Sequence, residues 1–433
     1  MSETTSTQGP PEAIDLLIHS ASQLVTCAGD ENPRRGAAMR QLNIIDNGAV
    51  AVHRERIVAV GHTYDLRARY EAHKAIDATG RAVVPGFVDS HTHAVYGGDR
   101  AQEFEMRIRG ATYVEIMATG GGILSTMQHT RQASEEALLV TARQRLDQML
   151  AQGSTTVEIK TGYGLDVQSE LKMLRVIEAL DRTHACDVVP TFLGAHTAPP
   201  EYKDDAEGYT RLVIEEMLPQ AVEWYQASHF ADTGVPFFAD VFCEEHAFDV
   251  SQSRRILHAA LDAGLRAKIH VDQFNSLGGL EMALDLGVTS ADHLEASTPS
   301  SLQRLAQSDA IAVPLPAVSF NLADDKYADA RALLDAGAAL ALATDLNPGS
   351  APCYGMPLVM AIACRYQRLL PAEALITSTI NAAHALSLGM RIGSLEPGKQ
   401  ADLLILRDHD YRHCAYFFGG NPVHTVIKRG QVV

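Results

Sequence analysis

The sequence has few of the features that mark secreted or membrane proteins. Its six cysteines are widely scattered among 433 residues and form no C-x-x-C pair. This spacing excludes a compact disulfide framework and suits a reducing compartment. No run of about 18 apolar residues is present, and the N-terminus lacks the basic residues and apolar core of a signal peptide. We therefore expect a cytoplasmic protein that is neither exported nor inserted into a membrane.

Positive charge is also scarce. The chain has 36 Lys and Arg against 53 Asp and Glu, which gives a formal net charge of −17. Such a charge repels phosphate backbones and anionic membrane surfaces, and no Lys/Arg-rich run offsets it locally. We therefore expect no nucleic-acid partner and no membrane partner. A small anionic substrate remains compatible with this charge, because one buried arginine can dominate the local potential.

The two ends of the chain differ from its middle in the pattern of apolar and polar residues. From residue 49 to residue 84, short β-rich segments such as AVAV, RIVAV and RAVV alternate with polar turns, and DLLIL and TVIKRGQVV repeat this pattern after residue 392. We infer a small β-sandwich domain built from residues 14–84 and 391–433. Residues 1–13, rich in Ser, Thr, Pro and Gly, are expected to form a disordered tail.

Residues 85–390 alternate apolar strands with amphipathic helices, which is typical of a parallel sheet with crossover helices. Eight segments fit strands: VVPGFVDSHTH, TTVEIKTGYG, VVPTFLGAHT, FFADVFCEEH, RAKIHV, VTSADHLE, IAVPLPAV and ALALATDLNPG. Ser134 and Gly153 bound one of the intervening helices, and Gly264 ends another. Polar residues gather at the C-terminal ends of the strands, as in barrel enzymes, so we predict an α/β fold with a closed (β/α)8 TIM barrel. An open doubly wound sheet is the structural alternative.

Four residues at strand ends can bind one metal ion. His91 and His93 end the first barrel strand, and their i, i+2 spacing projects both imidazoles from one face. His270 closes RAKIHV, and Asp345 closes ALALATD. Three histidines and a carboxylate suit Zn²⁺ or iron and leave room for a water molecule. The alternatives without a metal ion are a solvent-facing histidine pair and, for Asp345, a helix cap.

Three other motifs have more than one interpretation. His293, in SADHLE, can polarise a scissile carbonyl and stabilise an oxyanion, although a hydrogen-bonded structural histidine is the alternative. Glu244 and Glu245 are adjacent, so they face opposite ways and cannot flank one glycosidic bond; Glu244 is the candidate bridging ligand if a second metal ion is bound. The triglycine at residues 120–122 lacks the spacing of a dinucleotide motif and is expected to be a flexible loop.

Several longer segments resemble a known family. PGFVDSHTH and GSLEPGKQADLLIL are similar to the opening and closing motifs of the amidohydrolase superfamily, whose members pair a metal-dependent barrel with a β-sandwich made from both termini. Within it, HAVYGGDRAQEFEMRIRGATYVEI, EIKTGYGL, TFLGAHTAPPEY, HVDQFNSLGG, SADHLE and TDLNPGS resemble the imidazolonepropionase family. The similarity extends from about residue 85 to the C-terminus, and the motifs are long enough to be specific.

The resemblance implies a ligand set and a reaction. The metal ligands would be those inferred above, with Zn²⁺ or iron bound. The substrate-binding residues would be Arg100, Tyr163, His196, Gln273, Asn347, Gly349 and Ser350. The implied reaction is hydrolysis of 4-imidazolone-5-propanoate to N-formimidoyl-L-glutamate in histidine degradation, with Asp345 taking a proton from the attacking water. The resemblance leaves two alternatives: another amidohydrolase, such as a heterocycle deaminase, and a non-catalytic barrel scaffold.

The implied substrate residues suit this chemistry. Arg100 offers a planar fork to the propanoate carboxylate, although it could equally be a surface ion-pair partner. Tyr163 and His196 can orient a flat ring by hydrogen bonds. Gln273 cannot take a proton, but it can hold the ring. For a cytoplasmic barrel enzyme we expect a homodimer.

Overall fold

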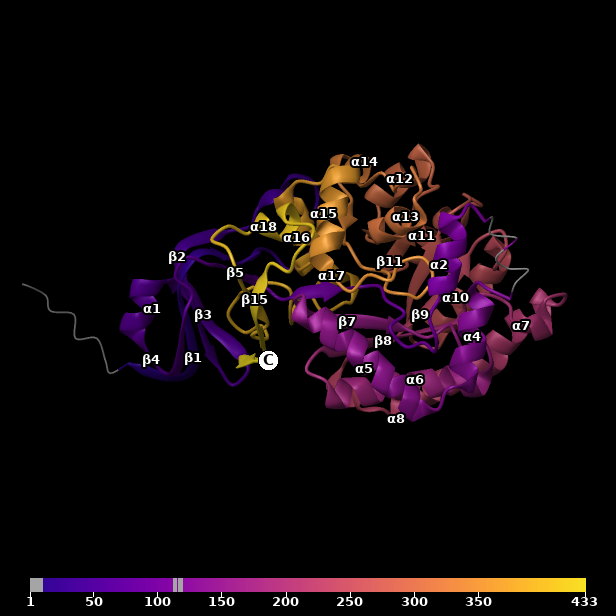
Figure 1. Cartoon of the computed structure of the whole chain (residues 1–433), viewed down its shortest axis with the longest axis horizontal. Coiled ribbons are helices and arrows are strands. Elements are labelled where there is room, and N and C mark those ends of the chain that lie inside the picture. Colours follow the sequence, from indigo (N-terminus) through magenta and orange to yellow (C-terminus); the bar gives the residue numbers. More distant parts are fainter. Residues whose placement is uncertain (1–10, 112–114, 116–119) are drawn as a thin grey trace, which may run out of the picture.

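Two sheets organise the computed structural model, which describes residues 11–111, 115 and 120–433 (Figure 1). One is a parallel sheet in the middle of the chain. The other is a mixed sheet made from both chain ends, coloured indigo and yellow at the left of Figure 1. The prediction of a barrel with a β-domain formed from both termini is therefore confirmed.

The barrel sheet has eight parallel strands in chain order. They are β6 (Phe87–Asp89), β7 (Ser154–Lys160), β8 (Asp187–Ala195), β9 (Phe238–Cys243), β10 (Arg266–Val271), β11 (Ser290–His293), β12 (Ile311–Val313) and β13 (Ala339–Leu340). Backbone bonds just beyond β6 and β13 close it: the Asp345 N–H donates to the His91 carbonyl over 3.0 Å, and the His93 N–H to the Leu346 carbonyl over 2.9 Å. Each of the eight predicted strand segments overlaps one of these strands, and the alternative of an open sheet is wrong.

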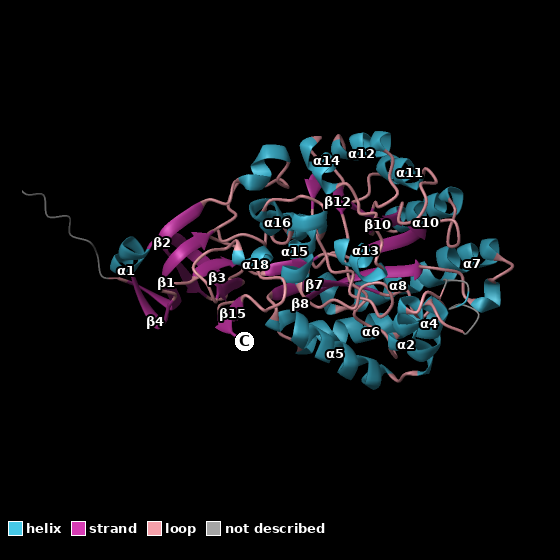
Figure 2. Ribbon diagram, turned by 45° about the horizontal axis from the view of Figure 1, so that its top comes forward, coloured by secondary structure: helices cyan, strands magenta, loops and turns pink. Residues whose placement is uncertain are grey.

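Helices surround the barrel strands (Figure 2). They are α2 (Ala101–Ile108), α4 (Ile123–Gln132), α5 (Glu135–Ala151), α6 (Val167–Thr183), α7 (Ala206–Leu212), α8 (Leu218–Ala227), α9 (His229–Thr233), α10 (Val250–Asp262), α11 (Gly279–Leu286), α12 (Pro299–Ala306), α13 (Pro316–Leu322), α14 (Ala330–Asp335), α15 (Met356–Tyr366), α16 (Pro371–Thr377), α17 (Ile380–Ala385), α18 (His413–Tyr416) and the short turns Gly36–Arg40, Pro200–Tyr202 and Val213–Met217. Ser134 caps α5 by accepting from the Ala137 N–H over 3.1 Å, and Gly153 follows with φ +99°. These boundaries agree with the sequence pattern. Among the described residues, each helix is too short or too polar to cross a lipid bilayer.

The terminal sheet is built around one long strand, β1 (Glu12–Val25). The other members are β2 (Ile44–His53), β3 (Arg56–His62), β4 (Tyr70–Asp77), β5 (Ala82–Pro85), β14 (Leu403–Leu406), β15 (Val423–Lys428) and β16 (Gln431–Val432). β1 pairs with β4 along its first half and with β5 near its end. On its other edge β1 pairs with β2, and that register shifts between Ile18 and Ala21, where Ser20 has a φ of +61°. Of the expected tail, residues 1–10 lie outside the described residues, and β1 begins at Glu12. A short helix, α1 (Thr63–Arg69), was not anticipated by the β-rich pattern.

A buried lysine joins this sheet to the barrel. The Nζ of Lys428, in β15, lies 2.7 Å from Asp187 of β8 and 2.6 Å from Asp402, which precedes β14. Arg429 adds an ion pair to Asp187 at 2.6 Å. Since Lys428 is buried and holds carboxylates of both sheets, it fixes the terminal domain against the barrel.

Replacing this lysine should destabilise the protein. Lys428→Met leaves Asp402 buried without its cation, so we expect the free energy of unfolding to fall by about 3 to 5 kcal/mol, as for other broken buried ion pairs. Urea denaturation measures this change. The control Lys326→Met alters an exposed lysine and should change stability by less than about 0.5 kcal/mol. Equal losses in both variants would contradict the joining role.

Candidate functional site

Three histidines meet at the C-terminal end of the barrel. His91 and His93 follow β6, and His270 lies in β10; their ligand-type nitrogens all lie within 4.8 Å of one another, and all three residues are buried. Asp345, which follows β13, has its Oδ1 3.4 Å from the Nε2 of His91 and 3.4 Å from that of His93. The structure thus brings the predicted ligands together, with the carboxylate beside two of the three histidines.

Several donor atoms of this cluster make no hydrogen bond. The Nε2 atoms of His91 and His270 and the Oδ1 of Asp345 are buried and make no hydrogen bond to the described part of the chain. Buried polar atoms are normally paired, so such a group of orphaned atoms indicates a ligand between them. Imidazole nitrogen and carboxylate oxygen are donors that Zn²⁺ and iron accept. The residues present therefore fit a metal ion.

The protonation states suit this interpretation. Burial lowers the pKa of His270 to about 3 and also lowers the pKa of His93, so both imidazoles are neutral, the form that binds a metal. Burial by itself would raise the pKa of Asp345, but its interactions with His91 and His93 hold that pKa well below the usual range. Asp345 is therefore an ionised carboxylate facing two imidazoles.

Two buried carboxylates orient the histidines from behind. The Oδ2 of Asp292 lies 2.6 Å from the Nδ1 of His91, and the Oδ2 of Asp240 lies 3.0 Å from the Nδ1 of His270. The Nζ of Lys160 lies 2.8 Å from Asp240 and 3.9 Å from Asp292. Although burial and Lys160 act in the opposite direction, Asp292 and Asp345 raise the pKa of His91 to about 9, so a metal ion that binds this ring must displace its proton. A carboxylate at Nδ1 fixes the ring and leaves Nε2 for a ligand.

Sequence reasoning missed these supporting residues. Lys160 also pairs with Glu158 at 2.7 Å, and Lys268 lies 3.4 Å from the same carboxylate. The signal was present in VEIK and AKIH, where charged residues occupy alternate positions of apolar strands. In a closed barrel that alternation sends one set of side chains into the interior. A charge on that set must find a partner there, and here Lys160 finds its partners on its own strand β7, on β9 and on β11.

Tyr163 and His196 lie against the cluster. The Tyr163 ring centre is 5.6 Å from that of His93, and His196 stacks on His93 at 5.1 Å with an interplanar angle of 14°. The Nδ1 of His196 lies 3.0 Å from the Gly162 carbonyl, so Nδ1 carries the hydrogen and Nε2 remains an acceptor. Burial lowers the pKa of His196 well below its usual value, so this ring too is neutral.

The loop after β13 carries Asn347, Gly349 and Ser350. The Nδ2 of Asn347 donates to Asp345 Oδ2 over 3.0 Å and to Ser350 Oγ over 2.8 Å. Its Oδ1 accepts from the backbone N–H groups of Gly349 and Ser350 at 2.9 and 2.7 Å. Arg100 packs on this loop so closely that a Cβ on Gly349 would lie 2.0 Å from its guanidinium. These predicted substrate residues form one continuous wall beside Asp345.

His293 lies next to the predicted metal ligands, and Gln273 lies on the adjacent loop. The His293 ring centre is 5.8 Å from that of His91 and 5.3 Å from that of His270. Its φ of +83° is unusual for a residue with a side chain, and such strained positions concentrate at functional sites. Gln273 is half-buried on the loop after β10.

Glu244 anchors the loop that carries Gln273. Its Oε2 accepts from the backbone N–H groups of Phe274 and Asn275 at 2.9 and 3.2 Å, and its Oε1 accepts from the Asn275 side chain at 2.9 Å. Both oxygens are therefore engaged in holding the loop. The alternative in which Glu244 bridges a second metal ion has no support in this geometry.

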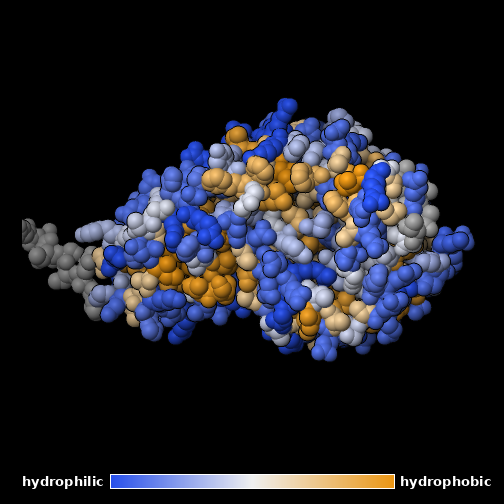
Figure 3. All heavy atoms as spheres, in the orientation of Figure 1, coloured by the Kyte–Doolittle hydropathy of each residue, from blue (hydrophilic) through white to orange (hydrophobic). Residues whose placement is uncertain are grey.

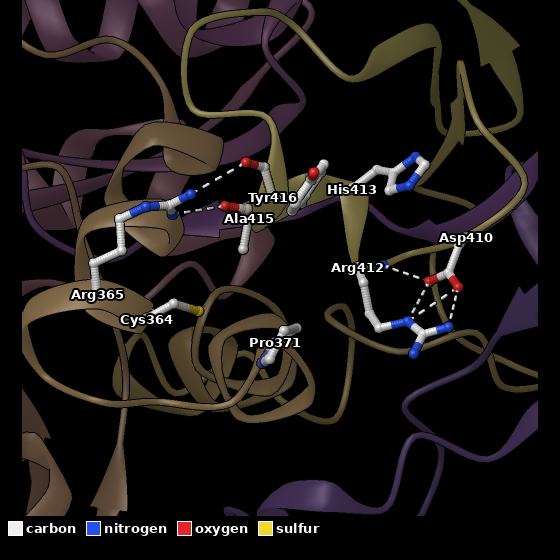
Figure 4. A pocket seen from close by; sticks show the side chains of 8 residues that line it. All are labelled: Cys364, Arg365, Pro371, Asp410, Arg412, His413, Ala415 and Tyr416. Carbon is white, nitrogen blue, oxygen red and sulfur yellow. Dashed lines mark hydrogen bonds and ion pairs between the residues drawn. The ribbon is translucent and has the colours of Figure 1, made fainter.

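A separate cavity of about 540 Å³ lies among α15, α16 and α18, away from this cluster (Figure 4). Its cationic side chains are already engaged, since Arg412 pairs with Asp410 and Arg365 donates to the carbonyls of Ala415 and Tyr416. None of the predicted site residues lines it. The chemically equipped site is the barrel mouth.

Comparison with known proteins identifies the family of this chain. Residues 82–433 match the model of the amidohydrolase family. The chain is 58% identical to an imidazolonepropionase from Chloroflexus aggregans, covering 98% of this chain and 99% of that protein, and 50% identical to one from Herpetosiphon aurantiacus, covering 97% of each. Among solved structures, a zinc-bound adenosine deaminase from Xanthomonas campestris has a TM-score of 0.70 at 20% identity, covering 98% of this chain and 93% of that one. A triazine hydrolase variant has a TM-score of 0.72 at 16% identity, covering 96% and 94%.

Removing the charge behind His91 should weaken metal binding. Asp292→Asn keeps the side-chain shape but withdraws the carboxylate from Nδ1, so we expect zinc affinity to fall by about 10- to 100-fold. Competition with a zinc chelator measures the affinity. The control Asp285→Asn changes a carboxylate that is half exposed and paired with Arg304, and it should leave affinity unchanged. Identical affinities for both variants would show that Asp292 does not tune the site.

Proposed function

The chain belongs to the amidohydrolase family, and we propose that it hydrolyses the cyclic amide bond of 4-imidazolone-5-propanoate to give N-formimidoyl-L-glutamate in histidine degradation. The observation that carries this proposal is 58% identity, over 98% of this chain, to an imidazolonepropionase. A heterocycle deaminase is the alternative, but the likeness to adenosine deaminase, at 20% identity, supports only a shared fold.

We propose that His91, His93, His270 and Asp345 bind one metal ion per chain, Zn²⁺ or iron. The orphaned, buried donor atoms and the carboxylates behind the rings support this set. When bound, such an ion would polarise the ring carbonyl and lower the pKa of the attacking water.

The protein residues would then move the proton. The carboxylate of Asp345, whose Oδ1 faces His91 and His93 and whose Oδ2 is held by Asn347, accepts a proton from the attacking water. The water oxygen bonds to the ring carbonyl carbon, and His293 stabilises the oxyanion that forms. The C–N bond then breaks, and the proton passes from Asp345 to the leaving nitrogen.

Substrate recognition divides between charge and hydrogen bonding. Arg100 binds the propanoate carboxylate, since its guanidinium offers several donors in one plane. Tyr163 and His196 hydrogen-bond the ring, and Gln273 positions it without taking a proton. Gly349 and Ser350 line the pocket beside Asp345. The close packing of Arg100 on Gly349 supports this arrangement.

The proposal also covers the binding partners, the cellular location and the oligomeric state of the protein. A net charge of −17 supports the absence of a nucleic-acid partner, and six free cysteines support a cytoplasmic location. We further propose a homodimer. Exposed apolar side chains such as Phe417 and Phe418, at 48% and 64% exposure, and the apolar area near α15 in Figure 3 support a protein-binding face.

The test is a ring-opening assay joined to metal analysis. We expect loss of the ultraviolet absorbance of the imidazolone without release of ammonia, about one metal ion per chain, and loss of activity on chelation that added metal restores. Release of ammonia would favour the deaminase. Two tightly bound ions, or activity that survives complete metal removal, would overturn the single-metal proposal.

The proton-transfer role of Asp345 can be separated from metal binding. In Asp345→Asn the amide oxygen can still approach a metal ion but cannot accept the proton, so kcat should fall by at least about 10²-fold while partial metal occupancy persists. Activity per bound metal is the quantity to measure. A value near that of the unaltered enzyme would mean that Asp345 is only a ligand and that His293 or a water chain is the base.

A further inference from the structure

A buried carboxylate, Glu103, lies between the proposed substrate clamp and the triglycine loop. Its Oε2 accepts from the Nε of Arg100 over 2.7 Å and lies 2.7 Å from the NH2 of the same guanidinium. Its Oε1 accepts from the backbone N–H of Gly122 over 2.9 Å. The Glu103 side chain is only 11% exposed, and that of Arg100 is 18% exposed. One carboxylate therefore holds two separate segments of the site.

This pairing engages one edge of the Arg100 guanidinium. A guanidinium has five N–H donors in one plane, and Glu103 engages the edge made by Nε and NH2. The remaining NH1 group lies against Gly349, where a Cβ would be only 2.0 Å away. Glu103 and Gly349 together fix the rotation of the guanidinium beside the loop that carries Ser350.

A second arginine, Arg107, adds positive charge beside Arg100. Arg107 donates to the Gly349 carbonyl over 3.0 Å. Burial lowers the pKa of Arg107, and the nearby charge of Arg100 lowers it further, whereas Glu103 raises it. Two cations with one carboxylate leave a net positive charge facing the loop, while Glu103 offsets the repulsion between the two guanidiniums.

We propose that Glu103 is a positioning residue for the substrate carboxylate: it orients Arg100 and ties that arginine to the loop at Gly122. This inference rests on the proposed function, because it assigns Arg100 to the propanoate. It predicts that Glu103 affects capture of the carboxylate and leaves the chemical step unchanged. A glutamine at this position has a single acceptor oxygen and no charge, so it cannot hold both partners.

Positioning of Arg100 and screening of positive charge predict opposite changes in KM when Glu103 is replaced. If Glu103 positions Arg100, then Glu103→Gln raises KM for 4-imidazolone-5-propanoate by about tenfold and changes kcat by less than about twofold. If Glu103 only screens positive charge, the same variant lowers KM, because a more positive pocket attracts the anion. The matched control is Glu105→Gln on the same helix, whose side chain is 63% exposed and pairs with Arg109. Metal content and the urea midpoint are measured for both variants.

Inhibitors separate carboxylate capture from ring binding. Glu103→Gln should raise the inhibition constant of imidazole-4-propanoate by about tenfold and leave that of 4-methylimidazole, which has no carboxylate, unchanged. Equal changes for both compounds would overturn the proposal. Should Glu103→Gln fold poorly, Glu103→Asp serves the same purpose, because it keeps the charge but is one methylene too short to reach both Arg100 and Gly122.

A double-mutant cycle distinguishes positioning from a purely structural role. In an Arg100→Ala background, Glu103→Gln should cause no further rise in KM, since there is no guanidinium left to orient. A rise as large as in the unaltered background would overturn the proposal. If the unaltered enzyme fails to open the imidazolone ring, the proposed function fails; if it opens the ring and Glu103→Gln matches Glu105→Gln, only this inference fails.

Discussion

The site depends on the ion pairs of a lysine that is buried inside the barrel. Lys160 lies among Glu158, Asp240 and Asp292, and all four side chains are fully buried. Removing charges from water is costly, and only close pairing offsets that cost. Here the pairing brings Asp240 and Asp292 up behind His270 and His91. The charged interior therefore fixes the orientation of two imidazoles before any ligand arrives.

The residues nearest the chemistry are held in strained backbone conformations. His293, Leu294 and Asp345 have φ values of +83°, +77° and +52°. Such conformations cost of order 1 to 3 kcal/mol each and persist only when the surroundings over-determine them. The Asp345 N–H bond to the His91 carbonyl and the Asn347 bond to the Asp345 carboxylate supply part of that constraint. The interactions that stabilise the folded barrel thus offset the cost of the strained conformations at its C-terminal end.

The sequence predicted what depends on local periodicity. His91 and His93 face one side because strand side chains alternate, and polar residues lie at the ends of most of the eight strand segments, so the barrel could be inferred and a cluster of ligand-type side chains at its end could be predicted. Contacts between distant strands could not be inferred, because alternation shows that Lys160 points inward but not that it meets Asp240. The change of partner along β1, from β4 to β5, likewise has no signal in the alternation of its side chains. The pairing of Glu103 with Gly122 depends on where a loop returns, which periodicity does not encode.

The barrel closes at the cluster of His91, His93, His270 and Asp345, and this fixes the order in which the molecule can be completed. His91 and His93 follow the first barrel strand and Asp345 follows the last, and Thr344 bonds to Asp89 across 255 residues of sequence. On a ribosome, the first strand must wait with an unpaired edge until nearly all of the barrel has been synthesised. The final strands of the terminal sheet, β14 to β16, emerge later still. The cluster is thus assembled only near the end of synthesis, and an ion held by these residues would fasten the two ends of the barrel together.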